Sequence, residues 1–94
     1  MIAETSREAY EKIKAKLNQK QGVVYGTLEA MGSATNDELA YELGWPIQSV
    51  TGRVSELKYK GMVTCVGIGK SRYGNSAKIW GIIHPNDHNL RNIR

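Results

Sequence analysis

The spacing of apolar residues along the chain changes near residue 61. Before this point apolar side chains recur at helical intervals, as at Val50, Val54 and Leu57, which are spaced i, i+4 and i+7 and share one helix face. After it come two runs rich in β-branched residues, at 62–66 and 79–83, with a glycine-rich segment between them. The pattern predicts a helical part followed by a β-hairpin.

Two helical segments are expected in the first third of the chain. Thr5 and Glu8 have the spacing of a capping box, and the apolar stripe that follows is formed by Tyr10, Ile13 and Leu17. A second stripe is formed by Val24, Leu28 and Met31. The run 19–22 between the two stripes weakens the pattern, so either one long helix bends near Gly22 and Gly26 or two helices meet there; we favour two helices.

Residues 35–61 predict two helices joined by a tight turn. Thr35 and Glu38 repeat the capping-box spacing, and Gly44 stands where a helix often takes a left-handed C-terminal residue. Pro46 suits the first position of the next helix, expected at 46–60, and Gly61 ends it. A short helix and a longer one around a glycine-containing turn are typical of a helix-turn-helix.

The segment 67–76 is expected to form a long hairpin loop, because it contains three glycines, an asparagine and two serines. Cys65 lies among valines in the first β-rich run and is interpreted as a half-buried structural thiol. The last segment, 84–94, has no periodicity and is expected to be a flexible tail.

Charge is distributed unevenly over the 94 residues, whose formal net charge is +4. Residues 1–45 carry five Lys/Arg against seven Asp/Glu, whereas residues 46–94 carry eight against two. This asymmetry favours a polyanionic partner for one face of the folded chain. The sequence has neither an apolar run that spans a bilayer nor the apolar run of a signal peptide, so we expect a cytoplasmic protein without membrane contact.

Three runs of the chain resemble the winged-helix DNA-binding family: TNDELAYELG at 35–44, QSVTGRVSEL at 48–57 and KGMV at 60–63. They are similar to the "ELA…LG…VS…L..L...GLV" run of winged-helix transcription regulators, and the compact form resembles small winged-helix proteins of phages and prophages. The resemblance implies an α+β fold at 22–83, a winged helix-turn-helix with a three-helix core and a C-terminal two-stranded hairpin, the wing. Residues 1–21 are then an extra N-terminal helical extension.

The resemblance also implies a function, which is to bind double-stranded DNA without doing chemistry on it. We expect a sequence-specific transcription regulator that places the third helix in the major groove and the wing, 67–78, on the flanking backbone or in the minor groove. Such a protein is nucleoid-associated when it is bound to DNA. The alternative is a phage-type protein-interaction module that binds or inhibits a host protein through the same scaffold.

The outer face of the third helix carries the candidate base-contacting residues. Helical spacing places on that face Gln48, Thr51, Gly52, Ser55 and Tyr59. Gln48 can bridge adenine N6 and N7 in the major groove, and Thr51 or Ser55 can contact base edges or phosphates. Ser49, near the start of the helix, can hydrogen-bond a phosphate.

Two residues of this helix, Gly52 and Arg53, each have two interpretations. A mid-helix glycine costs about 1 kcal/mol relative to alanine, so either DNA approaches the backbone at Gly52 or the protein's own hairpin packs against it. Arg53 either contacts DNA or pairs with Glu38 or Glu42 of the preceding helix. Lys58, near the helix end, suits the helix dipole with or without a ligand.

The wing supplies the remaining candidates, Lys70, Ser71, Arg72, Tyr73 and Lys78. An arginine on a hairpin tip can enter the minor groove, and lysines beside it can neutralise phosphates. Tyr73 either hydrogen-bonds a phosphate or packs under the loop. The alternative for the whole set is a basic loop that contacts only solvent.

No catalytic, metal or cofactor site is expected. His84 and His88 flank Pro85 and cannot share a helix face as a zinc pair would, and Gly67–Lys70 falls in a hairpin rather than in a phosphate-binding loop. Trp45 and Trp80 are interpreted as packing residues. A homodimer is expected through the N-terminal stripe, whose alternative is to pack on the core of its own chain.

Overall fold

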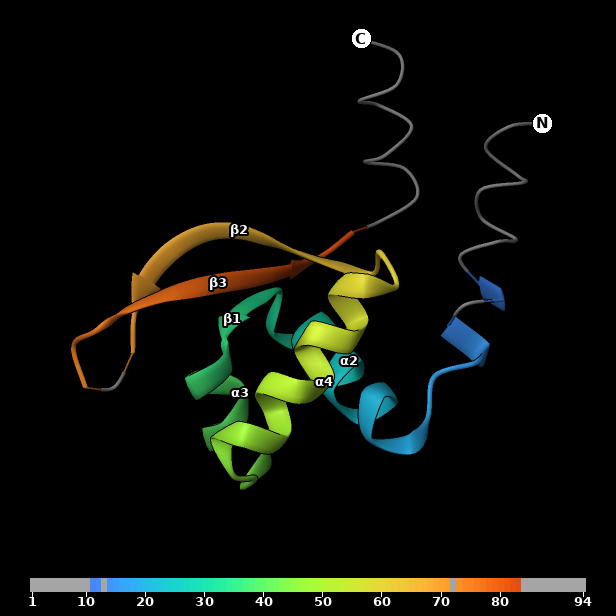
Figure 1. The fold of residues 1–94 in the computed structure, drawn as a ribbon, viewed down its shortest axis with the longest axis horizontal. Helices are drawn as coiled ribbons and strands as arrows, with labels where there is room; N and C mark the ends of the chain where they lie inside the picture. The colour runs from blue at the N-terminus through green and yellow to red at the C-terminus, as the bar shows by residue number, and fades with distance from the viewer. Residues whose placement is uncertain (1–10, 13, 72, 84–94) are drawn as a thin grey trace, which may run out of the picture.

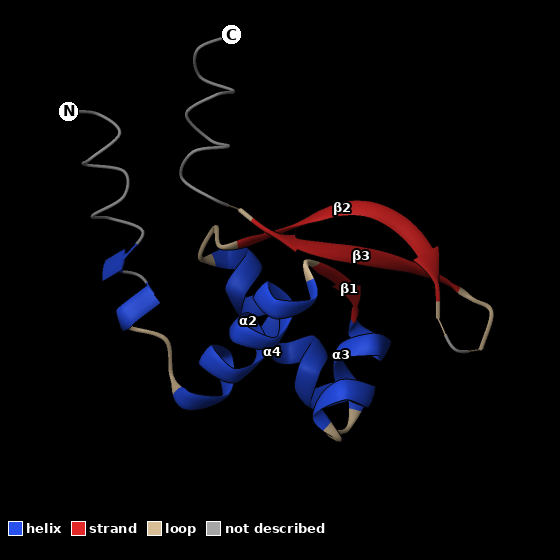
Figure 2. Ribbon diagram, turned by 180° about the vertical axis from the view of Figure 1, so that it is seen from behind, coloured by secondary structure: helices blue, strands red, loops and turns tan. Residues whose placement is uncertain are grey.

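The structure, a computed structural model, describes residues 11–12, 14–71 and 73–83. Three helices pack together under a small antiparallel sheet, and the hairpin of this sheet extends beyond the helices (Figures 1 and 2). The elements in chain order are α2 (Gln19–Met31), β1 (Ser33–Thr35), α3 (Asn36–Leu43), α4 (Ile47–Tyr59), β2 (Val63–Lys70) and β3 (Ser76–Ile82). The predictions for Thr5, Glu8, Tyr10, Ile13 and the tail 84–94 lie outside the described residues.

Residues 11–12 and 14–15 are also helical, and the break between them and α2 lies at residues 16–18 and not at the glycines where it was predicted. The Asn18 side chain accepts a hydrogen bond from the Gln21 N–H (2.8 Å), and the Gln21 side chain accepts one from the Asn18 N–H (3.1 Å). This capping box fixes the start of α2 at Gln19. Gly22 and Gly26 then lie within the helix, because a cost of about 1 kcal/mol each does not outweigh tertiary packing.

The turns at both ends of α3 form as predicted. Thr35 accepts a hydrogen bond from the Glu38 N–H (3.1 Å), while the Glu38 carboxylate accepts one from the Thr35 N–H (2.9 Å). Gly44 has a φ of 68°, the left-handed conformation that favours glycine. Pro46 precedes α4 as its N-cap instead of occupying its first helical position, so the predicted start at 46 moves to Ile47.

The end of α4 leads directly into the sheet. Gly61 has a φ of 77°, its N–H donates to the Lys58 carbonyl (2.9 Å), and the Met62 N–H donates to the Leu57 carbonyl (3.0 Å). These two bonds are those of a Schellman motif, which satisfies carbonyl groups at the end of a helix. Met62 is buried, and β2 begins one residue later.

The sheet has three strands in the order β1–β3–β2, all antiparallel, so the predicted two-stranded hairpin gains a strand. β1 pairs with the inner part of β3, with Ala34 opposite Trp80. The strand has only three residues, and a sequence that short carries no alternation from which to predict it. It forms because β3 offers a partner far along the chain.

The hairpin strands are longer than predicted, and the loop between them comprises only residues 71–75. Gly67 and Gly69 lie in β2, opposite Ile79 and Ala77, although the glycine-rich segment was expected to be loop. A Cβ atom on Gly69 would lie 3.1 Å from Cδ1 of Ile79, so the Ile79 side chain lies across the position that a side chain would occupy. Glycine here permits close packing within a strand.

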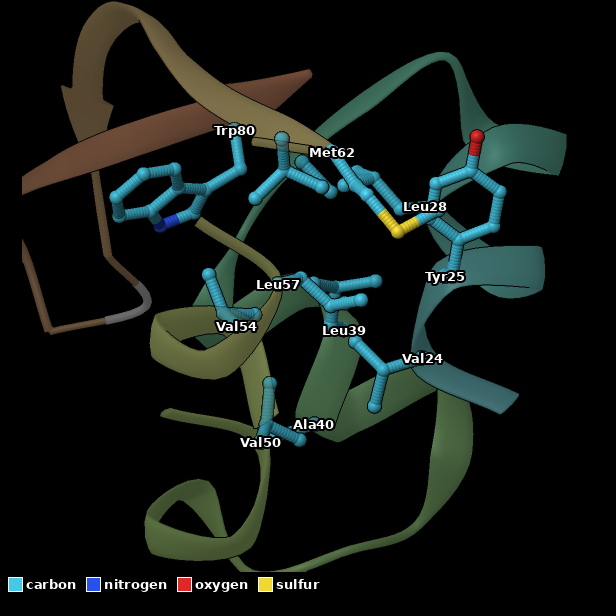
Figure 3. Close-up of a cluster of buried hydrophobic side chains, with 12 residues drawn as sticks. Val24, Tyr25, Leu28, Leu39, Ala40, Val50, Val54, Leu57, Met62 and Trp80 are labelled. Atoms are coloured by element: carbon cyan, nitrogen blue, oxygen red, sulfur yellow. The ribbon is translucent and has the colours of Figure 1, made fainter. Parts of the chain in front are cut away.

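The core lies between the three helices and the inner ends of β2 and β3 (Figure 3). Its members are Val24, Tyr25, Leu28, Ala34, Leu39, Ala40, Val50, Val54, Leu57, Met62, Val63 and Trp80. Leu17, Leu43, Trp45 and Ile82 pack against them. The prediction for the two tryptophans is therefore confirmed. The prediction for Cys65 is wrong, because this residue lies where β2 begins to leave the helices and is exposed.

Candidate nucleic-acid interface

Helix α4 has an apolar inner face and a polar outer face, as the spacing predicts. Val50, Val54 and Leu57 are buried. The exposed residues of the outer face are Gln48, Thr51, Ser55 and Tyr59, and Gly52 lies among them with intermediate exposure. Because the only acid of α4, Glu56, is held in an ion pair, this face presents hydroxyl and amide groups without a free carboxylate.

Gly52 has open space above it. A Cβ atom built there meets no heavy atom within 4 Å among the described residues. The interpretation in which the protein's own hairpin packs against Gly52 is therefore wrong for the part of the chain that the structure describes. Close approach of an external backbone or base stays as a prediction.

Arg53 pairs with a residue of its own helix. Its Nε donates to Oε1 of Glu56 and its Nη2 donates to Oε2, both at 2.8 Å, so neither Glu38 nor Glu42 is its partner. Oε1 of Glu56 also accepts a hydrogen bond from Nε2 of Gln21 in α2 (2.7 Å). These bonds hold the pKa of the Glu56 carboxyl below its ordinary value of 4.5, chiefly through Arg53, and raise the pKa of Arg53. We conclude that Arg53 is held on the α2 side of α4.

The basic side chains of this region are in solvent. Lys58 on α4, Lys70 at the end of β2 and Lys78 on β3 are all exposed. Lys58 and Lys78 also approach the same aromatic ring, that of Trp80, with their Nζ atoms 6.0 and 5.9 Å from its centroid. The wing and α4 therefore each place one cation beside Trp80.

A hollow of about 590 Å³ lies between the wing and the two helices of the helix-turn-helix. Its lining is drawn from α3, α4, β3, the turn between α3 and α4 and the hairpin loop, and comprises Asn36, Asp37, Ala40, Tyr41, Trp45, Ile47, Thr51, Ser71, Tyr73, Ala77, Lys78 and Trp80. Nδ2 of Asn36 lies 3.4 Å from Oγ1 of Thr51, which links α3 to α4 at this hollow. Thr51, a residue of the outer face of α4, is part of the lining.

Several residues of this hollow were missed by the sequence analysis. Asn36 and Tyr41 belong to α3 and reach this hollow because α3 packs against α4, which no local pattern shows. Ile47 lies one helical turn before Thr51 on α4, so helical spacing alone could have placed these two residues side by side. Tyr73, which is 82% exposed, does not pack under the loop as one interpretation had it. Its N–H donates to Oγ of Ser71 (3.3 Å) at the hairpin turn.

Some of the remaining candidates are partly buried, and others lie outside the described residues. Ser49 and Ser71 are half-buried, whereas Thr51 and Ser55 are exposed. Arg72, His84 and His88 lie outside the described residues. Within the described ranges, no group of three or more His, Cys, Asp or Glu side chains is placed to hold a metal ion. No helix within these ranges has both the length and the apolarity to cross a membrane.

Comparison with known proteins supports the fold but not a closer relationship. No family model matches the chain, and no curated protein matches it in sequence. Among solved structures it is similar to a MarR family regulator from Neisseria meningitidis, with a TM-score of 0.59 and 18% sequence identity over 90% of this chain. The match spans 64% of the length of that regulator. Together with three helices and a three-stranded antiparallel sheet, this similarity shows that the chain has the winged-helix fold.

Proposed function

We propose that the chain is a sequence-specific transcription regulator that binds double-stranded DNA through α4 and the wing. The observation that carries the proposal is the outer face of α4, which is exposed, polar and without a free carboxylate, and which shares a hollow with Lys78 of the wing. The second half of the chain is basic, with eight Lys/Arg against two Asp/Glu over 46–94, and this charge adds electrostatic attraction to phosphates. The similar fold of a MarR family regulator supports the same function by analogy.

In the proposed complex α4 lies in the major groove, which is wide enough to admit a helix. Gln48, Thr51 and Ser55 contact base edges, with Gly52 between them allowing the helix backbone to approach. Lys58, Lys70 and Lys78 contact phosphates, and the hairpin tip with Tyr73 and Arg72 lies on the flanking backbone or in the minor groove. Residues 22–83, together with the helix start at Gln19, form the DNA-binding domain of this proposal.

The proposal is tested by selecting binders from a random duplex library and measuring their affinity at two salt concentrations. We expect a consensus sequence, and an affinity that falls steeply as the salt concentration rises. In Gln48→Ala the preferred base at one or two positions should change, with discrimination reduced by about 1–3 kcal/mol if the contact to adenine is bidentate. The same consensus for the variant and the parent would remove Gln48 from base recognition.

A protein-interaction module is the second candidate, and the edge strand of the sheet favours it. Among the described residues one edge of β2 has no neighbouring strand, and β2 carries Val66 and Ile68 with exposed fractions of 57% and 65%. Exposed apolar side chains on an edge strand are typical of a surface that pairs with another chain. The duplex measurement separates the two candidates. A protein-binding module is expected neither to select a consensus sequence nor to bind duplex DNA with an affinity that falls steeply with salt.

A further inference from the structure

Trp80 lies at the joint between the wing and the helices. It belongs to the central strand, β3, with Ala34 of β1 opposite it on one side and Cys65 of β2 on the other. Its exposed fraction is 7%, and the indole lies at the edge of the buried cluster (Figure 3). A rigid aromatic face is thus fixed at the boundary between the core and solvent.

Two lysines from different elements approach this indole. Lys58 extends from the last turns of α4 and Lys78 from β3, and each Nζ atom lies within 6.0 Å of the ring centroid. An ammonium group at this distance is attracted by the negative face of an indole, the strongest aromatic partner for a cation. Both lysines are exposed, so each ammonium group can still donate hydrogen bonds to a ligand in solvent.

The two lysines approach Trp80 at the seam between α4 and the wing, and each of them lines a different hollow. Lys78 and Trp80 line the hollow of about 590 Å³ that also contains Thr51. Lys58 lines a second hollow, of about 450 Å³, with Ser55 and Tyr59. Thr51 and Ser55 are one helical turn apart, so each hollow is lined by one lysine and at least one hydroxyl group of α4. The second hollow contains no acidic residue among its described lining.

We propose that Lys58 and Lys78 form a two-cation clamp for phosphate groups along one DNA strand, with Trp80 as the residue that positions both. This proposal rests on the proposed function and names the contacts by which the protein holds the sugar–phosphate backbone. Duplex DNA presents one phosphate about every 3.4 Å of helix axis on each strand, so one strand following the seam offers phosphates to both cations. The indole restricts both side chains before binding, which lowers the conformational entropy that binding must remove.

The clamp is tested with Lys58→Gln/Lys78→Gln against a control that removes the same charge elsewhere, Lys16→Gln/Lys20→Gln. Affinity for a random-sequence duplex and for the selected site is measured by fluorescence anisotropy over a salt series. The clamp variant should bind both duplexes more weakly, with a slope of log K against log salt that is smaller by roughly two. The control should keep a slope near that of the parent. Lys58→Arg/Lys78→Arg retains both positive charges, so its affinity and slope should also stay near those of the parent.

The positioning by Trp80 is tested with Trp80→Phe, which keeps an aromatic face, and Trp80→Leu, which keeps only an apolar one. If both fold by circular dichroism, Phe should retain most of the affinity and Leu should lose it several-fold. A folded Trp80→Leu variant that binds with parental affinity overturns the positioning role of Trp80. A Lys58→Gln/Lys78→Gln variant with the same affinity and salt slope as the Lys16/Lys20 control overturns the clamp, and this outcome can be read even if Trp80→Leu does not fold. A parent that binds no duplex overturns the proposed function itself, and with it this inference.

Discussion

Gly52 occupies the middle of the outer face of α4, where a methyl group meets open space. Its backbone has no positive φ, so alanine fits the helix without strain. We expect Gly52→Ala to stabilise the fold by up to about 1 kcal/mol, because alanine has the higher helix propensity. If DNA approaches the backbone at this position, the same variant binds duplex more weakly although it is more stable. Chemical denaturation and duplex titration measure the two effects separately.

Gly26 provides the matched control for this prediction. It also lies within a helix, α2, and a Cβ atom there likewise meets nothing within 4 Å. Gly26→Ala should therefore give a similar gain in stability with no change in DNA binding. Equal DNA affinity for the Gly52→Ala variant and the parent would contradict close approach at Gly52.

Single residues were predicted well where burial follows from helix spacing, and poorly where it depends on the partner. Val50, Val54 and Leu57 were placed correctly, because a period of 3.6 residues fixes the inner face of a helix. One of the two interpretations of Arg53 paired it with acids of the preceding helix, and it was wrong about the partner, since the sequence does not show which neighbouring carboxylate lies in reach. Cys65 was expected to be half-buried, but its strand runs past the edge of the core.

At the scale of elements, Glu56 connects α2 to α4 through its bonds to Gln21 and Arg53. Because its pKa is below the ordinary value of 4.5 in the folded chain, the carboxylate contributes stability above pH 4.5. That contribution is lost as the pH falls through the folded-state pKa. Glu56→Gln should therefore be less stable than the parent at pH 7, and the difference should shrink below pH 4.5.

Denaturant unfolding at pH 7 and at pH 3 measures this difference. Glu29→Gln is the matched control, because it removes an exposed carboxylate of α2 outside the connection to α4. A difference between the Glu56→Gln variant and the parent that stays constant from pH 7 to pH 3 would show that the carboxylate charge has no part in joining the helices.

Elements were predictable to the extent that their signals are local. The helix-turn-helix follows from Thr35, Glu38, Gly44 and Gly61, each of which acts within one turn of its own position. β1 depends on pairing with β3, more than forty residues away in the chain, and no local pattern indicates it. The length of the wing strands depends on how Ile79 packs over the glycines opposite it, which is a tertiary contact.

At the scale of the whole molecule, the N-terminal extension has two alternative roles, which are to pack on the core of its own chain or to pair two copies of the chain. Leu17 packs against the core of its own chain, so for this residue the intramolecular alternative holds. The rest of the predicted stripe, Tyr10 and Ile13, lies outside the described residues. We propose that this remaining part pairs two copies of the chain, because one recognition helix reads too few base pairs to select a site in a genome.

Deleting residues 1–15 tests this proposal and leaves Leu17 and the Asn18 cap in place. We expect the full chain to sediment as a dimer at tens of micromolar, and the shortened chain to be a folded monomer with weaker DNA binding. Circular dichroism confirms that the deletion has not unfolded the domain. A full chain that sediments as a monomer contradicts the dimer, whatever its affinity for DNA.

The exposed thiol of Cys65 is a natural site for covalent labelling of the chain. It is the one cysteine of the sequence, and it lies directly opposite Trp80 across the β2–β3 ladder. A maleimide spin label or dye can therefore be attached at a single position without any engineered cysteine. A second probe on the end of a duplex would then report the distance from the wing to the DNA. The thiol also requires a reductant during purification, because exposed thiols on two molecules can oxidise to a disulfide that would imitate a native dimer.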